Sequence, residues 1–286
     1  MEFVRMRGVR WWPRRDAKGF SESQTAALKE LLSLVKADRY EEVEVRARAL
    51  ATVPHRNGGR DAMTVWLART FAASAAVLHG RGEDVLPELD ALSAELAHTS
   101  GTDRTVLLVN RVSRATVLIR LERYNEAEAE VSDVLRAVTR LAHLTDVWDV
   151  ELSALACLAE VLCAQGRYEE AEAVARGHLP RAKGSRATSL RCLLAQSLNG
   201  QGRYEEALAE RHIPTAPVSR AGTGHLGMVT ADALHGLGRR VEAETTARQA
   251  LDDCERLLHP SHPRIGKIRA LLADITAEEP PGEGSN

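Results

Sequence analysis

Small and apolar residues recur along this chain at fixed distances from an arginine that is itself repeated six times. The arginines are Arg39, Arg81, Arg123, Arg167, Arg203 and Arg239, separated by 42, 42, 44, 36 and 36 residues. Eight positions before each arginine stand Leu31, Ala73, Ala115, Ala159, Ala195 and Ala231. Four positions after each arginine stand Val43, Val85, Ala127, Ala171, Ala207 and Ala243. A period between roughly 20 and 50 residues indicates stacked structural repeats.

The two small positions predict that each repeat contains two helices whose backbones approach closely. All four tyrosines of the chain, Tyr40, Tyr124, Tyr168 and Tyr204, directly follow one of the repeated arginines. We expect the tyrosine ring to fill the space beside the contact between the two helices. The strings at residues 166–171 and 202–207 are identical, GRYEEA, and define the repeat most clearly.

Turn and capping signals divide the repeats into six predicted helix pairs. The pairs are expected over residues 22–37 and 40–52, 61–79 and 83–98, 103–121 and 124–142, 147–164 and 168–177, 186–199 and 204–212, and 218–236 and 240–257. Pro263 fits the first turn of one more helix, predicted over residues 263–277. A stacked repeat protein needs such an unpaired helix to cover its exposed end.

This repeat resembles the tetratricopeptide repeat, a helix–turn–helix unit of about 34 residues. The consensus of that family has a small residue in the first helix and Gly-x-Tyr-x-x-Ala at the start of the second. The longer early repeats, and the string LHPSHP at residues 258–263, resemble the kinesin-light-chain type; Val43 and Val85 depart from the expected alanine. The resemblance implies an all-α, right-handed superhelical solenoid of about six antiparallel helix pairs plus a C-terminal capping helix.

Composition agrees with a repeat protein and excludes several function classes. Aromatic residues make up only 4% of the 286 residues, and tight packing of Ala, Leu and Val helices explains that shortage. The net charge of -2 argues against a nucleic-acid-binding protein. No apolar run is long enough to span a membrane. Arginine outnumbers lysine 33 to 5, which we interpret as the coding bias of a GC-rich, bacterial genome.

The chain divides into three predicted parts. Residues 21–278 form the solenoid and residues 279–286 a disordered tail. Residues 1–20 form a flexible basic arm with a net charge of +4 around Trp11 and Trp12. The arm can make weak contact with an anionic membrane surface or with nucleic acid. Alternatively it is a disordered leader or a mis-assigned start whose tryptophans fold back on the first repeat, which is the interpretation we favour.

No constellation of residues indicates catalysis, a cofactor or a metal. Residues 222–227 spell G-x-G-x-x-G, but no strand precedes them, so we interpret them as a glycine-rich helix start. Cys157, Cys163, Cys192 and Cys254 form no C-x-x-C pair, and His259 and His262 belong to an inter-helix turn. We therefore expect no catalytic residues, no cofactor and no metal, and reduced thiols in a cytoplasmic protein.

In tetratricopeptide repeat proteins the first helices line a concave groove that holds an extended peptide or a partner helix. When the groove-facing positions of the family are transferred to this sequence, they give polar candidates with charges of both signs. These are Ser74, Thr116, Arg120, Glu160, Gln196, Asn199, Asp232 and His235. Lys29, Lys36 and Arg120 are not arranged like the family's carboxylate-gripping lysine and asparagine set, so we do not expect chaperone-tail binding. Each candidate can equally be part of an ordinary solvated helix face.

Three function classes follow from this interpretation. The first is a non-enzymatic scaffold or adaptor that binds a protein or peptide in the groove. The second is a regulatory sensor whose solenoid binds a small ligand or signalling peptide and acts on a separate effector protein. The third is an enzyme, for which the sequence offers no site. The partner, the pathway, the use of groove or convex face, and the oligomeric state are all left open by the sequence.

Overall fold

The protein is all-α in the part of the chain that the computed structural model describes, residues 22–37, 39–52, 60–78, 82–98, 104–141, 147–211 and 222–277. The predicted arm and tail lie outside these residues. The described helices are α1 (Glu22–Lys36), α2 (Tyr40–Ala51), α3 (Arg60–Leu78), α4 (Gly82–Leu96), α5 (Arg104–Arg120), α6 (Tyr124–Leu141), α7 (Trp148–Ala164), α8 (Tyr168–His178), η3 (Leu179–Arg181, a 3-10 turn), α9 (Ser185–Gly200), α10 (Tyr204–Arg211), α11 (His225–Gly236), α12 (Arg240–Leu257) and α13 (Pro263–Ala277).

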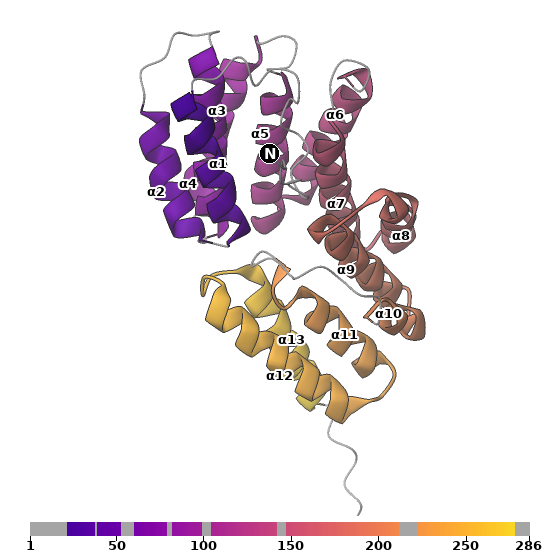
Figure 1. Ribbon diagram of the computed structural model, residues 1–286. Coiled ribbons are helices and arrows are strands. Elements are labelled where there is room, and N and C mark those ends of the chain that lie inside the picture. Colours follow the sequence, from indigo (N-terminus) through magenta and orange to yellow (C-terminus); the bar gives the residue numbers. More distant parts are fainter. Residues whose placement is uncertain are drawn as a thin grey trace, which may run out of the picture.

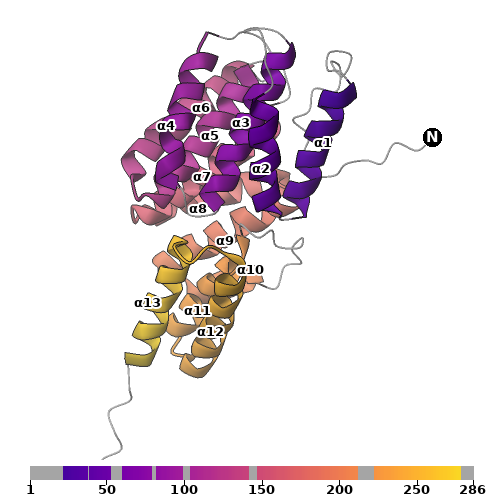
Figure 2. The same ribbon diagram turned by 90° about the vertical axis from the view of Figure 1, so that its left-hand side faces the viewer.

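The helices form the predicted solenoid of antiparallel pairs with a terminal helix. Odd-numbered helices pack side by side, α3 on α5, α5 on α7, α7 on α9 and α9 on α11, and each even-numbered helix packs against its odd-numbered neighbours. The terminal helix α13 covers α12 and also contacts α11. Figures 1 and 2 show α11 to α13 lying together below the arc of the earlier helices.

Every small or apolar position of the repeat is buried. The six residues before the repeated arginine and the six after it have at most 4% of their surface exposed. Since larger side chains at these positions would push paired helices apart, they hold the repeat spacing. The aromatic shortage has the same cause, because most of the core is Ala, Leu and Val.

The repeated string GRYEEA makes the turn between the two helices of a repeat. Gly166 has φ 75° and Gly202 has φ 73°, a left-handed conformation that glycine adopts without strain. The next backbone N–H then reaches back across the turn, as Arg203 N–H does to Leu198 O at 2.9 Å. The tyrosine is the first residue of the second helix in α2, α6, α8 and α10.

In two repeats, the repeated arginine joins its own repeat to the preceding one through its side chain. Arg203 pairs with Glu206 of the following helix at 2.6 Å and with Glu172 of the preceding repeat at 2.7 Å. Arg167 makes the equivalent pairs with Glu170 and Glu128. A single exposed ion pair stabilises a fold little, but a network with two carboxylates and good geometry contributes more. The arginine is therefore structural.

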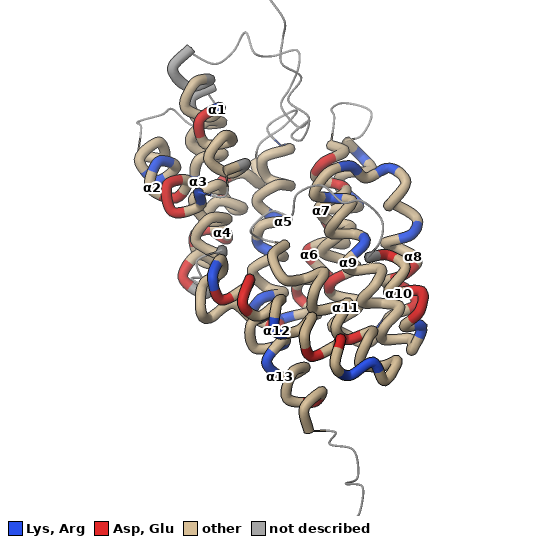
Figure 3. Tube along the Cα trace, turned by 60° about the horizontal axis from the view of Figure 1, so that its bottom comes forward, with Lys and Arg blue, Asp and Glu red and all other residues tan. Residues whose placement is uncertain are grey.

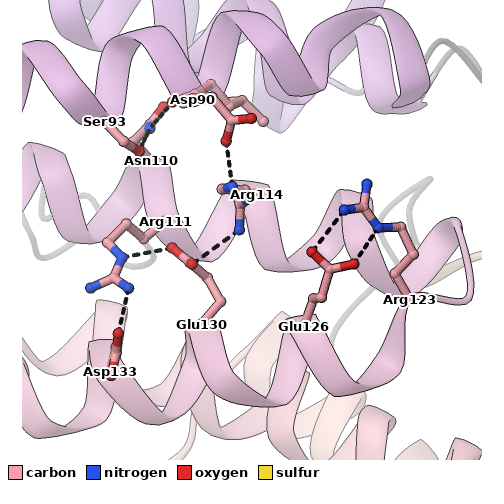
Figure 4. Close-up of polar contacts among 10 residues, drawn as sticks. Asp90, Ser93, Asn110, Arg111, Arg114, Arg123, Glu126, Glu130 and Asp133 are labelled. Atoms are coloured by element: carbon pink, nitrogen blue, oxygen red, sulfur yellow. Dashed lines mark hydrogen bonds and ion pairs between the residues drawn. The ribbon is translucent and has the colours of Figure 1, made fainter.

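A second polar network joins α4, α5 and α6 (Figure 4). Asn110, fully buried, donates to Leu89 O at 2.9 Å. Arg111 and Arg114 of α5 both pair with Glu130 of α6. Because these two arginines are held by carboxylates, they are not available to a ligand.

One predicted boundary is wrong. We expected the first helix of the sixth repeat to begin at residue 218, but α11 begins at His225. Gly224 has φ 71° and directly precedes the helix, so the backbone turns there instead of continuing the helix. Residues 212–221 lie outside the described part of the chain.

Candidate functional site

A cavity of about 400 Å³ lies on the face formed by the odd-numbered helices. Its walls come from α5, α7, α9 and the start of α11, and it is completed by the first turn of α13. Because α11 to α13 lie beneath the arc, Arg264 of α13 lines the same cavity as Arg120 of α5, more than a hundred residues earlier (Figure 1). The volume is in the range of small-ligand sites.

Equivalent positions of successive inner helices supply its floor. Thr116, Glu160 and Gln196 stand one repeat apart on α5, α7 and α9, and all three line the cavity. Thr116 lies one helical turn before Arg120 and donates to Val112 O at 3.0 Å. Four of the eight predicted groove residues therefore meet at one cavity.

The other four predicted groove residues lie elsewhere. Ser74 lines a separate apolar pocket of about 150 Å³ between α2, α3 and α5, where its hydroxyl lies 3.0 Å from that of Ser113. Asn199 is buried and donates to Val229 O at 2.8 Å and to Asp232 at 2.9 Å. Burial raises the pKa of Asp232, and the hydrogen bond from Asn199 partly offsets that shift. His235, in the last turn of α11, is not among the cavity-lining residues.

Cationic groups dominate the cavity. Burial lowers the pKa of the Arg120 guanidinium, while the charge of Glu160 opposes that shift and the charge of Arg264 adds to it. Burial likewise lowers the pKa of Arg186, with Asp149 opposing. Arg186 is solvent-exposed by area, yet it stands inside a hollow with protein on several sides, so its charge is poorly solvated. All these arginines stay charged at neutral pH.

Two histidines in the cavity are neutral. Burial, together with the nearby charges of Arg264 and Lys267, lowers the pKa of His225 to about 3. The same causes, with Arg120 added, lower the pKa of His262 to about 3. His262 Nδ1 accepts the Arg264 backbone N–H at 3.2 Å, which makes its Nε2–H the donor. A neutral histidine with a fixed tautomer offers one directed hydrogen bond.

Sequence reasoning missed Arg186, His225, His262, Arg264 and Lys267 as cavity residues. The register of the inner helices predicts which residues of α5, α7 and α9 face the cavity. It does not predict which later segment completes the cavity wall. The string LHPSHP was interpreted only as a turn. It is a turn, and it also carries His262 into the cavity wall.

Helix packing explains two of the three glycines of G-x-G-x-x-G. A Cβ at Gly224 would overlap Cys254 Sγ, and a Cβ at Gly227 would overlap Ala250 Cβ of α12. All four cysteines are free and buried, and burial raises the pKa of Cys157 and Cys192 to about 11. Within the described residues, no three His, Cys, Asp or Glu side chains are grouped as metal ligands.

Charged residues of both signs are spread along the described helices, with no single basic face (Figure 3). Among these helices, none combines the length and the apolar character that crossing a membrane requires.

Sequence profiles of the tetratricopeptide repeat match residues 152–177, 188–211 and 231–264. These segments contain α7 with α8, α9 with α10, and the end of α11 with α12 and the first turn of α13. These segments are tetratricopeptide repeats. The profile that matches twice is of the kinesin-light-chain type, as the longer repeats and the string LHPSHP predicted. A search of curated protein sequences gave no significant match.

The tetratricopeptide solenoid also has a solved counterpart of similar shape. The crystal structure of a Rap protein complexed with Competence and Sporulation Factor superimposes with a TM-score of 0.65 at 14% sequence identity. The alignment covers 90% of this chain and 72% of the Rap chain. This likeness concerns the fold.

Proposed function

We propose that this chain is a non-catalytic regulatory receptor that binds a short peptide or a comparable small ligand in the concave cavity and acts on a separate effector protein. The observation that carries the proposal is the composition of the cavity wall. Arg120 of α5 and Arg264 of α13 line one hollow, so a single occupant contacts both halves of the described solenoid. A ligand that binds one arrangement of the two halves more tightly shifts the protein toward it.

The fold relative supports a receptor over a passive scaffold. The Rap protein of that structure is complexed with a factor for competence and sporulation, and its fold matches nine tenths of this chain. A cavity of about 400 Å³ holds a few residues of extended peptide or a small molecule, but not a partner helix. A protein scaffold would use a longer open groove instead.

A cavity-blocking variant tests the proposal. Ser189 is exposed on α9 and lines the cavity, so Ser189→Trp fills it without disturbing the core. Ala173, exposed on α8 and absent from the cavity wall, gives the matched control Ala173→Trp. The full chain and both variants are incubated with the low-mass fraction of the native host's lysate, re-isolated and unfolded, and the released compounds are identified by mass spectrometry.

We expect the wild type and Ala173→Trp to retain the same compound and Ser189→Trp to lose it. Addition of that compound at 100 times its dissociation constant should then stabilise the wild type by about 2.7 kcal/mol. Small-angle scattering should show compaction of the complex. If all three proteins retain the same compounds, or none, the receptor proposal fails. If all three proteins instead capture the same large protein from the unfractionated lysate, the scaffold interpretation replaces it.

A further inference from the structure

The charges on the cavity wall are not balanced. The charged residues that line it are Arg120, Arg186, Arg264 and Lys267, against Asp149 and Glu160. Four positive and two negative groups leave a local net charge of +2, whereas the whole chain carries -2. Because both cavity histidines are neutral, they do not change this count.

Two of the three cavity arginines have no hydrogen-bonded protein partner. Elsewhere in the solenoid arginines are held by carboxylates, as Arg111, Arg167 and Arg203 are. Within the described residues, Arg120 and Arg186 make no ion pair or hydrogen bond through their side chains. A guanidinium whose charge is poorly solvated and which lacks a carboxylate is stabilised by any anion that reaches it.

His262 supplies a directed donor at the same place. Its side chain is only 6% exposed, and its Nε2 has no partner within the described part of the chain. A buried donor without an acceptor is destabilising, and a ligand oxygen that accepts from it removes that cost. The charges of Arg120, Arg264 and Lys267 all act on this ring, so the donor stands among the cations.

The start of α11 adds a fixed positive field. Gly222 and His225 line the cavity, and no side chain caps the first turn of this twelve-residue helix. Uncapped N–H groups at a helix N-terminus favour negative charge. Together with the unpartnered arginine and the buried histidine donor, they make one region of the wall electropositive.

We propose that the ligand of this cavity presents an anionic oxygen group, a carboxylate or a phosphate, which lies between Arg120 of α5 and the first turn of α13, in reach of His262, Arg264 and Lys267. This inference rests on the proposed receptor function and adds the chemistry of its ligand. The anion joins the two halves of the solenoid through charge-assisted hydrogen bonds. A peptide offers it as a free C-terminal carboxylate or an acidic side chain, and a small metabolite as a carboxylate or a phosphate.

The test uses probes that differ in the anion. Hexapeptide libraries are prepared as free acids and as C-terminal amides, each with and without acidic residues, and inorganic phosphate is a separate probe. Binding to the full chain is measured by retention and mass spectrometry for peptides and by calorimetry for phosphate. Arg120→Gln and Lys267→Met remove cavity cations. The controls Arg140→Gln and Lys183→Met remove exposed cations absent from the cavity wall.

We expect anionic peptides to be enriched over neutral amides. We expect Arg120→Gln and Lys267→Met each to weaken their binding about tenfold or more, with the controls unchanged. The pKa of His262, followed by NMR of its ring, should rise when the anion binds. A purely structural role of Arg120 would not cause this rise. Preference for free acids without acidic residues would identify the C-terminus as the source, and preference for acidic residues in amides would identify a side chain.

Other outcomes separate the two proposals. One outcome is that peptides bind and Ser189→Trp abolishes binding, while free acids and neutral amides bind equally and Arg120→Gln has no effect. The anion inference is then overturned, and the proposed receptor function stands. If no peptide binds but phosphate does, and Arg120→Gln abolishes it, the anion site stands and peptide recognition fails. If neither probe binds, the anion inference is overturned.

Discussion

The ring of Tyr168 lies on the backbone of Gly200, the last residue of the first helix in the next repeat, so closely that any Cβ at residue 200 would overlap the ring. Tyr204 lies on Gly236 in the same way one repeat later. In these two places the tyrosine of one repeat therefore requires a glycine in the following one. This pairing sets the close spacing of the short C-terminal repeats.

We predict that Gly200→Ala lowers the free energy of unfolding by about 1–3 kcal/mol, because the tyrosine ring must move out of a packed site. Gly177→Ala is the control, since a Cβ at this helical glycine meets nothing within 4 Å. The control substitution should raise the free energy of unfolding by about 0.5–1 kcal/mol, because alanine has a higher helix propensity than glycine. Urea unfolding measures both. Equal effects of the two substitutions would contradict the packing argument.

We predict that Arg203→Ala lowers the free energy of unfolding by more than the loss of a single exposed ion pair does. It removes the pairs with Glu172 and Glu206 and a hydrogen bond to Gln201 at 3.2 Å, so that the hydrogen bond from Gln201 is what still links Glu172 to the next repeat. Arg256→Ala, which loses one exposed pair with Asp253, should cost less than about 0.5 kcal/mol. Unfolding in low and high salt compares the two. A cost for Arg203→Ala no larger than that control would show that the inter-repeat pair is inert.

The sequence predicts the solenoid well because the repeat is local. Each helix pair is encoded by small residues, a turn glycine and a tyrosine within one repeat length, and each repeat needs only its neighbours. The six pairs and the terminal helix were all placed this way, and the boundaries agree within about two residues except at α11. At α11, the periodicity of the sequence does not show that the helix begins only after Gly224, whose φ is 71°.

The cavity is harder to predict because it is not local. Thr116, Arg120, Glu160 and Gln196 follow from the register of the inner helices, since equivalent positions face the same side. The closing segment around Arg264 does not, because small rotations summed over several repeats decide where α13 lies. Register also cannot separate a ligand-facing residue from one such as Asn199, whose side chain is used within the protein.

Asn199 provides a third prediction, which separates structure from ligand binding. Asn199→Ala should lower the free energy of unfolding by about 1–3 kcal/mol, because Val229 O and Asp232 lose their donor in a buried site. Asn125→Ala is the control: Asn125 is exposed and accepts one long hydrogen bond at 3.3 Å. Calorimetry on the folded variant should show unchanged cavity binding. Weakened binding at full stability would instead place Asn199 in the ligand site.

The cavity histidines predict a pH dependence of stability. His225 and His262 bind protons near pH 6.5 when unfolded, but their folded pKa values are about 3, so unfolding takes up protons between these limits. Stability is therefore complete above pH 6.5 and is lost as the pH falls toward 3. For His262 alone the loss between pH 6.5 and 5 is about 1.5 kcal/mol.

Urea unfolding across this pH range tests the histidine prediction. His262→Gln and His225→Gln should each flatten the decline, while the exposed His98→Gln should leave it unchanged. Burial also lowers the pKa of His178. A variant that carries both His225→Gln and His262→Gln should therefore keep part of the decline in stability with falling pH. A slope that neither cavity variant changes would show that these rings bind protons equally in the folded and unfolded states, and would contradict their lowered pKa.

The glycine string at α11 gives the last prediction. Gly224→Ala should lower the free energy of unfolding by about 2–4 kcal/mol, because it combines the strain of φ 71° with overlap between the new Cβ and Cys254 Sγ. Gly238→Ala shares the same φ of 71° but meets nothing within 4 Å, so it should cost only about 1 kcal/mol. Thermal unfolding with and without a nicotinamide dinucleotide measures both effects. Stabilisation of the wild type by the dinucleotide, lost in Gly224→Ala but kept in Gly238→Ala, would show that the string binds a cofactor and would overturn its assignment to helix packing.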